Sequence, residues 1–126
     1  MSLWALVASP LLAGNDIRTM TDATKAILLN KEVIAVDQDA LGKQASPRKN
    51  GDLETWMKPL ADGSVAVGVV NLGSSAAQAT VKASDLGLSG KVKKARDLWA
   101  HSDVKFSNGA YAATVPSHGV LMLRVK

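Results

Sequence analysis

The hydrophobic pattern of this sequence changes near residue 42, and the change limits the fold to two unlike parts. Before residue 42, apolar residues recur at the spacing of a helix. After it, short alternating runs are separated by turns that contain glycine. The second part predicts an antiparallel β-sandwich, because about seven short, closely spaced strands are typical of two packed sheets.

The first 20 residues predict a short helix followed by a buried strand. Apolar residues within 3–7 fit one face of a helix that must end near Ser9, since Pro10 restricts the backbone of the residue before it. The run 11–13 fits a fully buried strand that opens into the polar segment Gly14-Asn15-Asp16. A single buried strand cannot form a sheet alone, so the elements that should flank it are missing.

Helical spacing returns after residue 20. Thr21 is a suitable N-cap, and Asp22 suits the positive end of a helix dipole. Asn30 is predicted to end one helix and to cap the next. The apolar helical face comprises Ala23, Ile27, Leu28, Val33, Ile34 and Val36.

The remainder of the chain is predicted to be β. Residues 42–51 are polar and rich in helix and strand breakers, which predicts a linker or long loop. Strands are then predicted at 53–58, 64–71, 77–82, 92–99, 103–106, 110–115 and 119–125. In the second of these, both alternating sets of side chains are small or apolar, so both faces are predicted to be covered.

Composition excludes several classes of function. The chain has no cysteine, which excludes disulfides, thiol catalysis and cysteine-ligated metal sites. Its net charge is +4, and only 4% of residues are aromatic. The basic run of Lys91, Lys93, Lys94 and Arg96 is interpreted as the solvated face of a strand, so no nucleic-acid partner is expected. Residues 2–13 fall well short of the ~18 apolar residues needed to span a membrane, so no membrane partner is expected.

The polar residues form no recognisable catalytic or metal-binding pattern. His101 and His118 are predicted in separate loops without a third ligand, which argues against zinc. The pairs Asp37/Asp39 and Asp52/Glu54 each occupy alternate positions of one short segment. Glycosidic chemistry requires two facing carboxylates, so caps, turns and surface charge are the preferred interpretation.

Two further groups have a structural and a functional interpretation. Asn15 and Asp16 follow the predicted buried strand, where α/β proteins place active-site groups, but hydrogen bonding within the turn is the simpler interpretation. The aromatic residues are either a sugar-stacking platform or packing residues, and packing is favoured. They are Trp4, Trp56, Trp99, Phe106 and Tyr111.

Several segments together resemble glycoside hydrolase family 27, the α-galactosidases and α-N-acetylgalactosaminidases. The longest are residues 2–18, Ser-Leu-Trp-Ala-Leu-Val-Ala-Ser-Pro-Leu-Leu-Ala-Gly-Asn-Asp-Ile-Arg, and residues 30–44, Asn-Lys-Glu-Val-Ile-Ala-Val-Asp-Gln-Asp-Ala-Leu-Gly-Lys-Gln. Shorter similar segments lie at 56–60, 62–64, 96–99 and 116–119. Ala40 departs from the proline that the family commonly has there.

The resemblance implies where the chain belongs in such an enzyme, which has a (β/α)8 barrel followed by an antiparallel sandwich. A complete barrel needs at least ~200 residues, more than the 126 present. Residues 3–9, 10–15 and 21–38 resemble the end of the seventh barrel helix, the eighth strand and the last barrel helices. We therefore expect a mainly β fold, with a Greek-key-like antiparallel β-sandwich preceded by a short helix–strand–helix remnant of a (β/α)8 barrel. The expected divisions are a barrel segment at 1–41, a linker at 42–51 and the sandwich at 52–126.

The resemblance also limits what this chain is expected to do. The family are retaining glycosidases whose nucleophile and acid/base aspartates, and whose main galactose-binding residues, lie on barrel segments before this sequence. No catalytic, cofactor or metal residue is therefore assigned here, Asp16 included, although it is expected near the site. The parent reaction, hydrolysis of terminal α-galactosides, needs no metal or organic cofactor. Preference for galactose or N-acetylgalactosamine, and localisation, stay open.

Three roles follow for the chain itself. The first is a structural accessory domain whose partner is the missing barrel, with the α-galactoside substrate met only through the parent enzyme. The second is a stand-alone carbohydrate-binding or interaction module with an exposed aromatic row. The third is self-association through barrel-facing apolar residues without cover, because exposed patches drive association. These are Leu3, Leu6, Leu11, Leu12, Ile27 and Val33.

Overall fold

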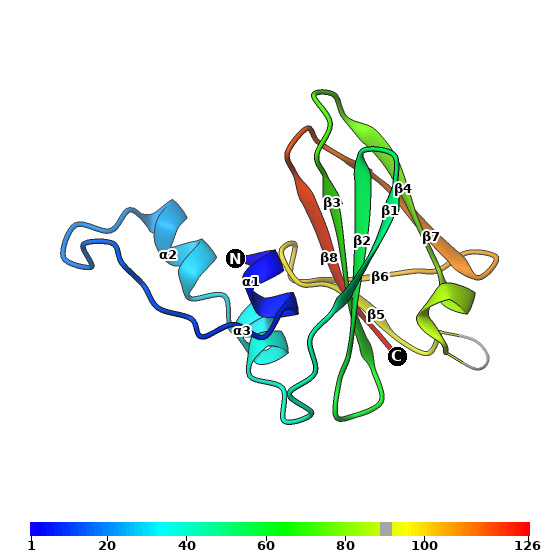
Figure 1. Cartoon of the computed structure of the whole chain (residues 1–126), viewed down its shortest axis with the longest axis horizontal. Coiled ribbons are helices and arrows are strands. Elements are labelled where there is room, and N and C mark those ends of the chain that lie inside the picture. Colours follow the sequence, from blue (N-terminus) through cyan, green and yellow to red (C-terminus); the bar gives the residue numbers. More distant parts are fainter. Residues whose placement is uncertain (89–91) are drawn as a thin grey trace.

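A computed structural model describes residues 1–88 and 92–126, and a six-stranded antiparallel sheet organises it (Figure 1). Three α-helices precede the sheet: α1 (Ser2–Leu6), α2 (Asp22–Leu28) and α3 (Lys31–Asp37). A short 3-10 helix, η1 (Ala83–Leu86), follows the fourth strand. The strands are β1 (Ser46–Asn50), β2 (Leu53–Pro59), β3 (Val65–Asn71), β4 (Ala77–Lys82), β5 (Ala95–Asp97), β6 (Ser102–Val104), β7 (Ala110–Val115) and β8 (Val120–Val125).

The strand order shows why the chain folds as a sandwich. The large sheet has the order β1-β2-β3-β8-β5-β6, and the small sheet pairs β4 with β7. The chain thus leaves the large sheet after β3, returns for β5 and β6, crosses again for β7, and finally inserts β8 between β3 and β5. All the pairings are antiparallel. The expected mainly β, Greek-key-like sandwich is confirmed.

One face of the large sheet packs against the small sheet. Alternate residues of β3 and β8 point inward and meet the inward residues of β4 and β7, as period-2 patterning requires. The buried core between the sheets contains Val67, Val69, Ala79, Val81, Leu86, Ala95, Val115, Leu121, Leu123 and Val125.

The opposite face of the same sheet is covered by α1 and α3, as Figure 1 shows. Ala66 and Met122 contribute the sheet side of this second core. Its helical side consists of Ala5, Leu6, Val33 and Val36, all with 0% exposure. The prediction that both faces of the strand at 64–71 are covered is therefore confirmed.

Gly68 permits the close approach of α1 to the sheet. A Cβ built on Gly68 would overlap Cδ1 of Leu6, whose side chain is completely buried. Only glycine at this position leaves room for the leucine, because the interior is close-packed.

Both predicted helix caps are present. Thr21 Oγ1 accepts a hydrogen bond from the Thr24 N–H at 3.2 Å at the start of α2. Asn30 Oδ1 accepts from the N–H groups of Glu32 and Val33 at 3.0 and 3.2 Å at the start of α3. Asn30 also donates from Nδ2 to the Leu98 carbonyl oxygen at 2.9 Å, so this cap fixes α3 to the sandwich.

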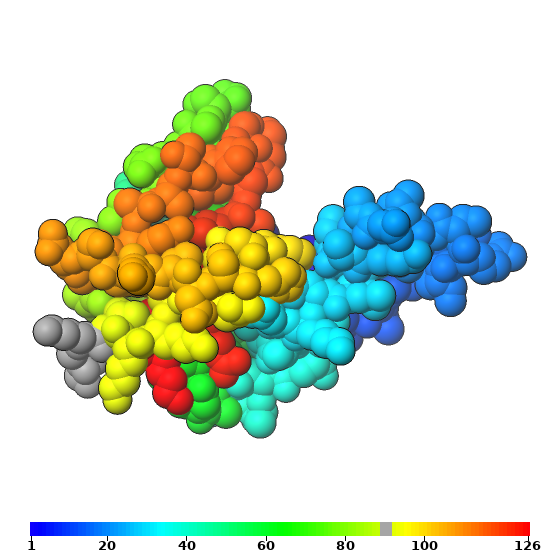
Figure 2. All heavy atoms as spheres, turned by 180° about the vertical axis from the view of Figure 1, so that it is seen from behind, coloured from blue at the N-terminus to red at the C-terminus, as the bar shows by residue number. Residues whose placement is uncertain are grey.

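The predicted strand at 11–13 is not formed. Residues 9–14 have no regular structure, and Leu12 is 77% exposed. A strand needs neighbours for its N–H and C=O groups, and no strand of the described residues lies beside this one. The segment instead projects from the rest of the molecule together with α2. Figure 2 shows this projection in blue and light blue.

Two further differences concern the β part. The predicted linker at 42–51 contains β1, whose five exposed residues pair along β2 from Ser46↔Met57 to Asn50↔Leu53. Pro47 interrupts the strand signal of this segment, but proline is tolerated on an edge strand. The predicted strand at 92–99 is shorter, because only Ala95–Asp97 has strand partners.

None of the helices in the described ranges is long and apolar enough to cross a membrane.

The substitution Gly68→Ala tests the contact between α1 and β3. We expect it to lower the free energy of unfolding by about 1–3 kcal/mol, because the added methyl must displace Leu6 from a packed core. Urea unfolding followed by tryptophan fluorescence measures the change. Gly14→Ala is the matched control, since its Cβ would meet nothing within 4 Å in the described part of the chain. Equal stability of the two variants would contradict the packing argument.

Candidate functional site

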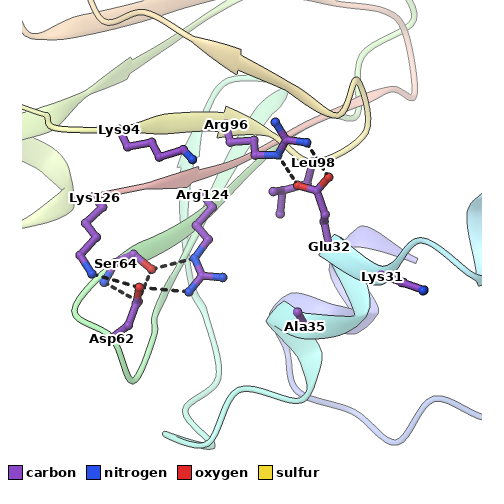
Figure 3. Close-up of a pocket in the computed structure, with 10 residues that line it drawn as sticks. All are labelled: Lys31, Glu32, Ala35, Asp62, Ser64, Lys94, Arg96, Leu98, Arg124 and Lys126. Carbon is purple, nitrogen blue, oxygen red and sulfur yellow. Dashed lines mark hydrogen bonds and ion pairs between the residues drawn. The ribbon is translucent and has the colours of Figure 1, made fainter.

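The polar residues gather where α3 meets the large sheet (Figure 3). Glu32, in the first turn of α3, accepts hydrogen bonds from Arg96 of β5: Nε to Oε2 at 2.5 Å and Nη2 to Oε1 at 2.9 Å. His101 Nδ1 lies 2.7 Å from Glu32 Oε1. Two parallel N–H···O bonds give the Glu32–Arg96 pair a fixed geometry.

This geometry determines the charge of Glu32. The guanidinium of Arg96 lowers the pKa of Glu32 from 4.5 to about 2, against the opposing effect of burial, with a smaller contribution from His101. The same pair raises the pKa of Arg96. A general acid of a glycosidase needs a raised pKa, so Glu32 is unsuited to that role.

A second ionic cluster surrounds Asp62, in the turn between β2 and β3. Asp62 Oδ1 accepts from Ser64 N and Ser64 Oγ at 3.0 and 2.5 Å. Asp62 Oδ2 lies 3.2 Å from both Arg124 Nη2 and Lys126 Nζ. The hydrogen bonds from Ser64, followed by those from the two cations, hold the pKa of Asp62 well below its usual range.

The two clusters border a cleft of about 380 Å³ on the outer face of the sheet. Figure 3 shows the Asp62 turn on one side and Glu32 of α3 on the other. Both carboxylates already have cationic partners, and both are held ionised. The cleft therefore offers ion-pairing groups rather than an acid and base pair.

No local pattern in the sequence predicts this cleft. Glu32 and Arg96 are 64 residues apart, as are Asp62 and Lys126, and each pair joins different elements. The prediction of a solvated strand face is wrong for Arg96, whose side chain is only 33% exposed because α3 lies over it. Lys93 and Lys94 are exposed as predicted, and Lys91 lies outside the described residues.

A lysine connects the helices to the sheet beneath them. Lys58 of β2 is completely buried, and its Nζ donates to the carbonyl oxygens of Ala5 and Asp37 at 3.1 and 3.4 Å. These carbonyls lie in the last turns of α1 and α3, where helix carbonyls lack the usual donor four residues on. Burial lowers the pKa of Lys58, and the charges of Asp37 and Asp39 oppose the shift.

Asp16 lies in the projecting segment, away from these clusters. It accepts hydrogen bonds from the backbone N–H of Arg18 at 2.9 Å and from its guanidinium at 2.8 and 3.0 Å. The side-chain contact with Arg18 lowers the pKa of Asp16. These contacts agree with the turn interpretation for Asp16.

The other predicted carboxylates also have local partners. Asp39 Oδ1 accepts from the N–H groups of Leu41 and Ala61 at 3.0 and 2.9 Å, and Glu54 pairs with Lys49 at 3.0 Å. The prediction of surface charge is wrong for Asp37, which is only 7% exposed at the end of α3 and contacts Gln38. Asp37 is buried because α3 places it where this helix packs on the large sheet.

His101 and His118 lie in separate turns, both with positive φ. His101 contacts Glu32, whereas His118 precedes β8. Within residues 1–88 and 92–126, no three His, Asp or Glu side chains gather in a way that would hold a metal ion.

The aromatic residues divide between the two faces of the sheet. Trp56 and Trp99 pack against the helix-side core, and Trp99 donates from Nε1 to Ser2 Oγ at 2.8 Å. Phe106 and Tyr111 pack against the other core, with ring centroids 6.0 Å apart. Packing is therefore their role in the fold, and Trp4 is partly exposed at 38%.

Fold and ionic clusters together define a β-sandwich domain carrying a helical segment on one sheet. The family described as "Alpha galactosidase C-terminal beta sandwich domain" matches residues 50–125. The chain belongs to this family, and residues 1–39 match the family described as "Alpha galactosidase A".

Individual relatives agree with this family. An α-galactosidase of Coffea arabica is 52% identical over 119 residues, covering 93% of this chain and 32% of the relative. The crystal structure of α-galactosidase I from Mortierella vinacea has a TM-score of 0.91 and 34% identity, covering 98% of this chain and 33% of that one. A family 27 β-L-arabinopyranosidase from Geobacillus stearothermophilus has a TM-score of 0.90 and 28% identity, covering 99% of this chain and 28% of that one. The chain thus spans about a third of the length of the relatives it matches.

The substitution Glu32→Gln removes the carboxylate and tests the ion pair between Glu32 of α3 and Arg96 of β5. A depressed folded pKa stabilises the fold above the unfolded pKa, so the pair contributes above pH 4.5 and is lost as the pH falls toward 2. We expect the wild type to be more stable by about 1 kcal/mol at neutral pH, after allowance for solvent screening, and the two curves to converge near pH 2. Urea unfolding across this range measures both.

Asp103→Asn serves as the control. Asp103 contacts the same guanidinium at 3.3 Å but is 60% exposed, so its loss should change stability much less. Parallel stability curves for wild type and Glu32→Gln down to pH 2 would contradict the assigned pKa shift.

Proposed function

We propose that this chain forms the C-terminal structural part of an α-galactosidase-like glycoside hydrolase and does not hydrolyse glycosides by itself. In this role, residues 1–41 are the terminal segment of a (β/α)8 barrel, and the sandwich packs against them. The parent enzyme would hydrolyse terminal α-galactosides with retention. The matched families and the α-galactosidase relatives support this proposal.

The two-sided character of the first 29 residues carries the proposal. On one side, Ala5 and Leu6 are completely buried against the sheet. On the other side, six large apolar residues are exposed: Leu3 (38%), Trp4 (38%), Leu12 (77%), Ile17 (73%), Ile27 (47%) and Leu29 (64%). Such a density of exposed apolar side chains marks a surface that another structure covers. The remaining part of a barrel would supply that cover.

The set of apolar residues predicted to lack cover divides in two. Leu6 and Val33 have 0% exposure, contrary to the prediction, because α1 and α3 pack on the sheet. Leu3, Leu12 and Ile27 stay exposed and Leu11 is half-buried, so α1, α2 and the segment between them are the parts that need a partner.

A carbohydrate-binding module is less well supported. Such a module stacks sugars on aromatic rings that share one exposed face. Here Trp56 and Trp99 pack beside the helices, while Phe106 and Tyr111 pack at the opposite face of the sheet.

Hydrolysis of a chromogenic α-galactoside tests the proposed function. The purified chain is compared with the intact Coffea arabica enzyme at equal molarity, and we expect no turnover above buffer from the chain. Turnover that co-elutes with the chain in size-exclusion chromatography would overturn the proposal. In that event Asp16→Asn would be measured next, because Asp16 is the carboxylate that the resemblance expects near the parent site.

Self-association of the isolated chain is the second expected consequence. The uncovered apolar residues should produce concentration-dependent dimers or larger species in sedimentation velocity experiments. The double substitution Leu12→Ser, Ile17→Ser should weaken association about tenfold or more, since buried apolar contacts of this size exceed about 1.4 kcal/mol. Leu72→Ser is the matched control, because Leu72 is 53% exposed in the turn after β3. A chain that stays monomeric at all concentrations would contradict this expectation.

A further inference from the structure

Four cations form an array on strands β5 and β8 and at their ends. In the antiparallel pair of β5 and β8, Arg96 lies directly opposite Arg124. Lys94 and Lys126 are each two residues from an arginine of this pair, and therefore on the same face. Backbone pairing continues there, because the carbonyl oxygen of Lys126 accepts hydrogen bonds from the N–H groups of Lys93 and Lys94, at 2.6 and 2.9 Å. Lys94 and Lys126 thus lie beside the arginine pair, and all four side chains line the cleft below α3.

Such an array is unfavourable without anions. Like charges directly opposite each other in a sheet repel, and these four lie close together on one face. Glu32 offsets the charge of Arg96 from the helix side, and Asp62 offsets those of Arg124 and Lys126 from the turn. Asp103, beside the cleft, also lies 3.3 Å from Arg96 and 4.0 Å from Lys94. Four cations therefore face three carboxylates, which leaves an excess of one positive charge between the two clusters.

Arg124 and Lys94 also keep hydrogen-bond donors that can serve a ligand in the cleft. Arg124 uses Nε for Ser64 at 3.0 Å and Nη2 for Asp62 at 3.2 Å, which leaves Nη1 without a hydrogen-bond partner among the described residues. Lys94 Nζ is 4.0 Å from Asp103, beyond hydrogen-bond length. Figure 3 shows the guanidinium of Arg124 between Asp62 and α3, whereas Lys31 points away from the other residues drawn.

We propose that this cleft binds an oxyanion group, a carboxylate, phosphate or sulfate, held chiefly by Arg124 and Lys94. The guanidinium presents planar donors that match oxyanion geometry, and the ammonium adds a compact charge. The cavity of about 380 Å³ admits a small anion or a sugar that carries one. This site does not depend on the proposed function, because it lies wholly on the described surface of this chain.

Titration of the full chain with inorganic phosphate, followed by backbone amide shifts in NMR at constant ionic strength, tests the proposal. We expect saturable shifts in β5, β8 and the first turn of α3. Arg124→Gln and Lys94→Gln should each weaken binding about tenfold, the value of one charge-assisted hydrogen bond. Lys25→Gln is the matched control, since Lys25 is an exposed lysine of α2 that contacts Asp22 outside the cleft.

Parallel titrations with galacturonate and galactose identify the source of the anion. These sugars differ in a carboxylate, so binding of galacturonate without galactose supports an acidic sugar, whereas binding of phosphate alone supports a free or esterified phosphate. Lys94→Gln keeps the test valid if Arg124→Gln unfolds, because Lys94 is 66% exposed. The proposal is overturned if neither anion gives saturable shifts, or if the cleft variants bind like Lys25→Gln.

Discussion

The contact between helix α1 and strand β3 is the constraint on which the rest of the structure depends. Strand β3, at the centre of the large sheet, is apolar on both faces, and a strand of this kind is stable only when both faces are covered. The small sheet covers one face, and α1 with α3 covers the other. Leu6 approaches the backbone at Gly68 because that residue has no side chain. Burial of a leucine contributes about 1.5–3 kcal/mol, so this contact alone is a substantial part of a domain's stability.

Polar side chains also hold α1 and α3 against the large sheet. Helices this short are not stable alone, so they depend on such contacts. Asn30 caps α3 and reaches the Leu98 carbonyl, while Lys58 satisfies carbonyl oxygens at the ends of α1 and α3. The pair of Glu32 and Arg96 adds directional contacts between helix and sheet. Each of these groups pairs a helix with the sheet, so α1 and α3 form one structure with the sandwich rather than a tethered part.

The N-terminal helical segment has exposed apolar residues that agree with a place inside a larger enzyme of this family. Within the first 29 residues, α1 packs on the sandwich, whereas the segment after it exposes large apolar side chains such as Leu12 and Ile17. The solved structures that this chain resembles include both an α-galactosidase and a β-L-arabinopyranosidase. The same sandwich fold therefore occurs in glycosidases that act on different sugars, so the fold of this part does not by itself select a substrate.

The amino-acid sequence by itself determined the elements whose signals are local. The cap residues Thr21 and Asn30, the two apolar faces of β3 and the half-buried pattern of β4 could all be predicted, because each depends on spacing along one segment. The family could also be identified from the residues alone, because the first 44 residues carry two long segments that resemble it. Tertiary structure alone decided the rest. Residues 11–13 do not form the predicted strand because no neighbouring strand pairs with them. Pro47 lies in a strand because β1 pairs along the edge of β2. The array of Arg96 and Arg124 exists only because β8 inserts beside β5, and hydrogen-bond register between distant strands leaves no periodic trace in the sequence.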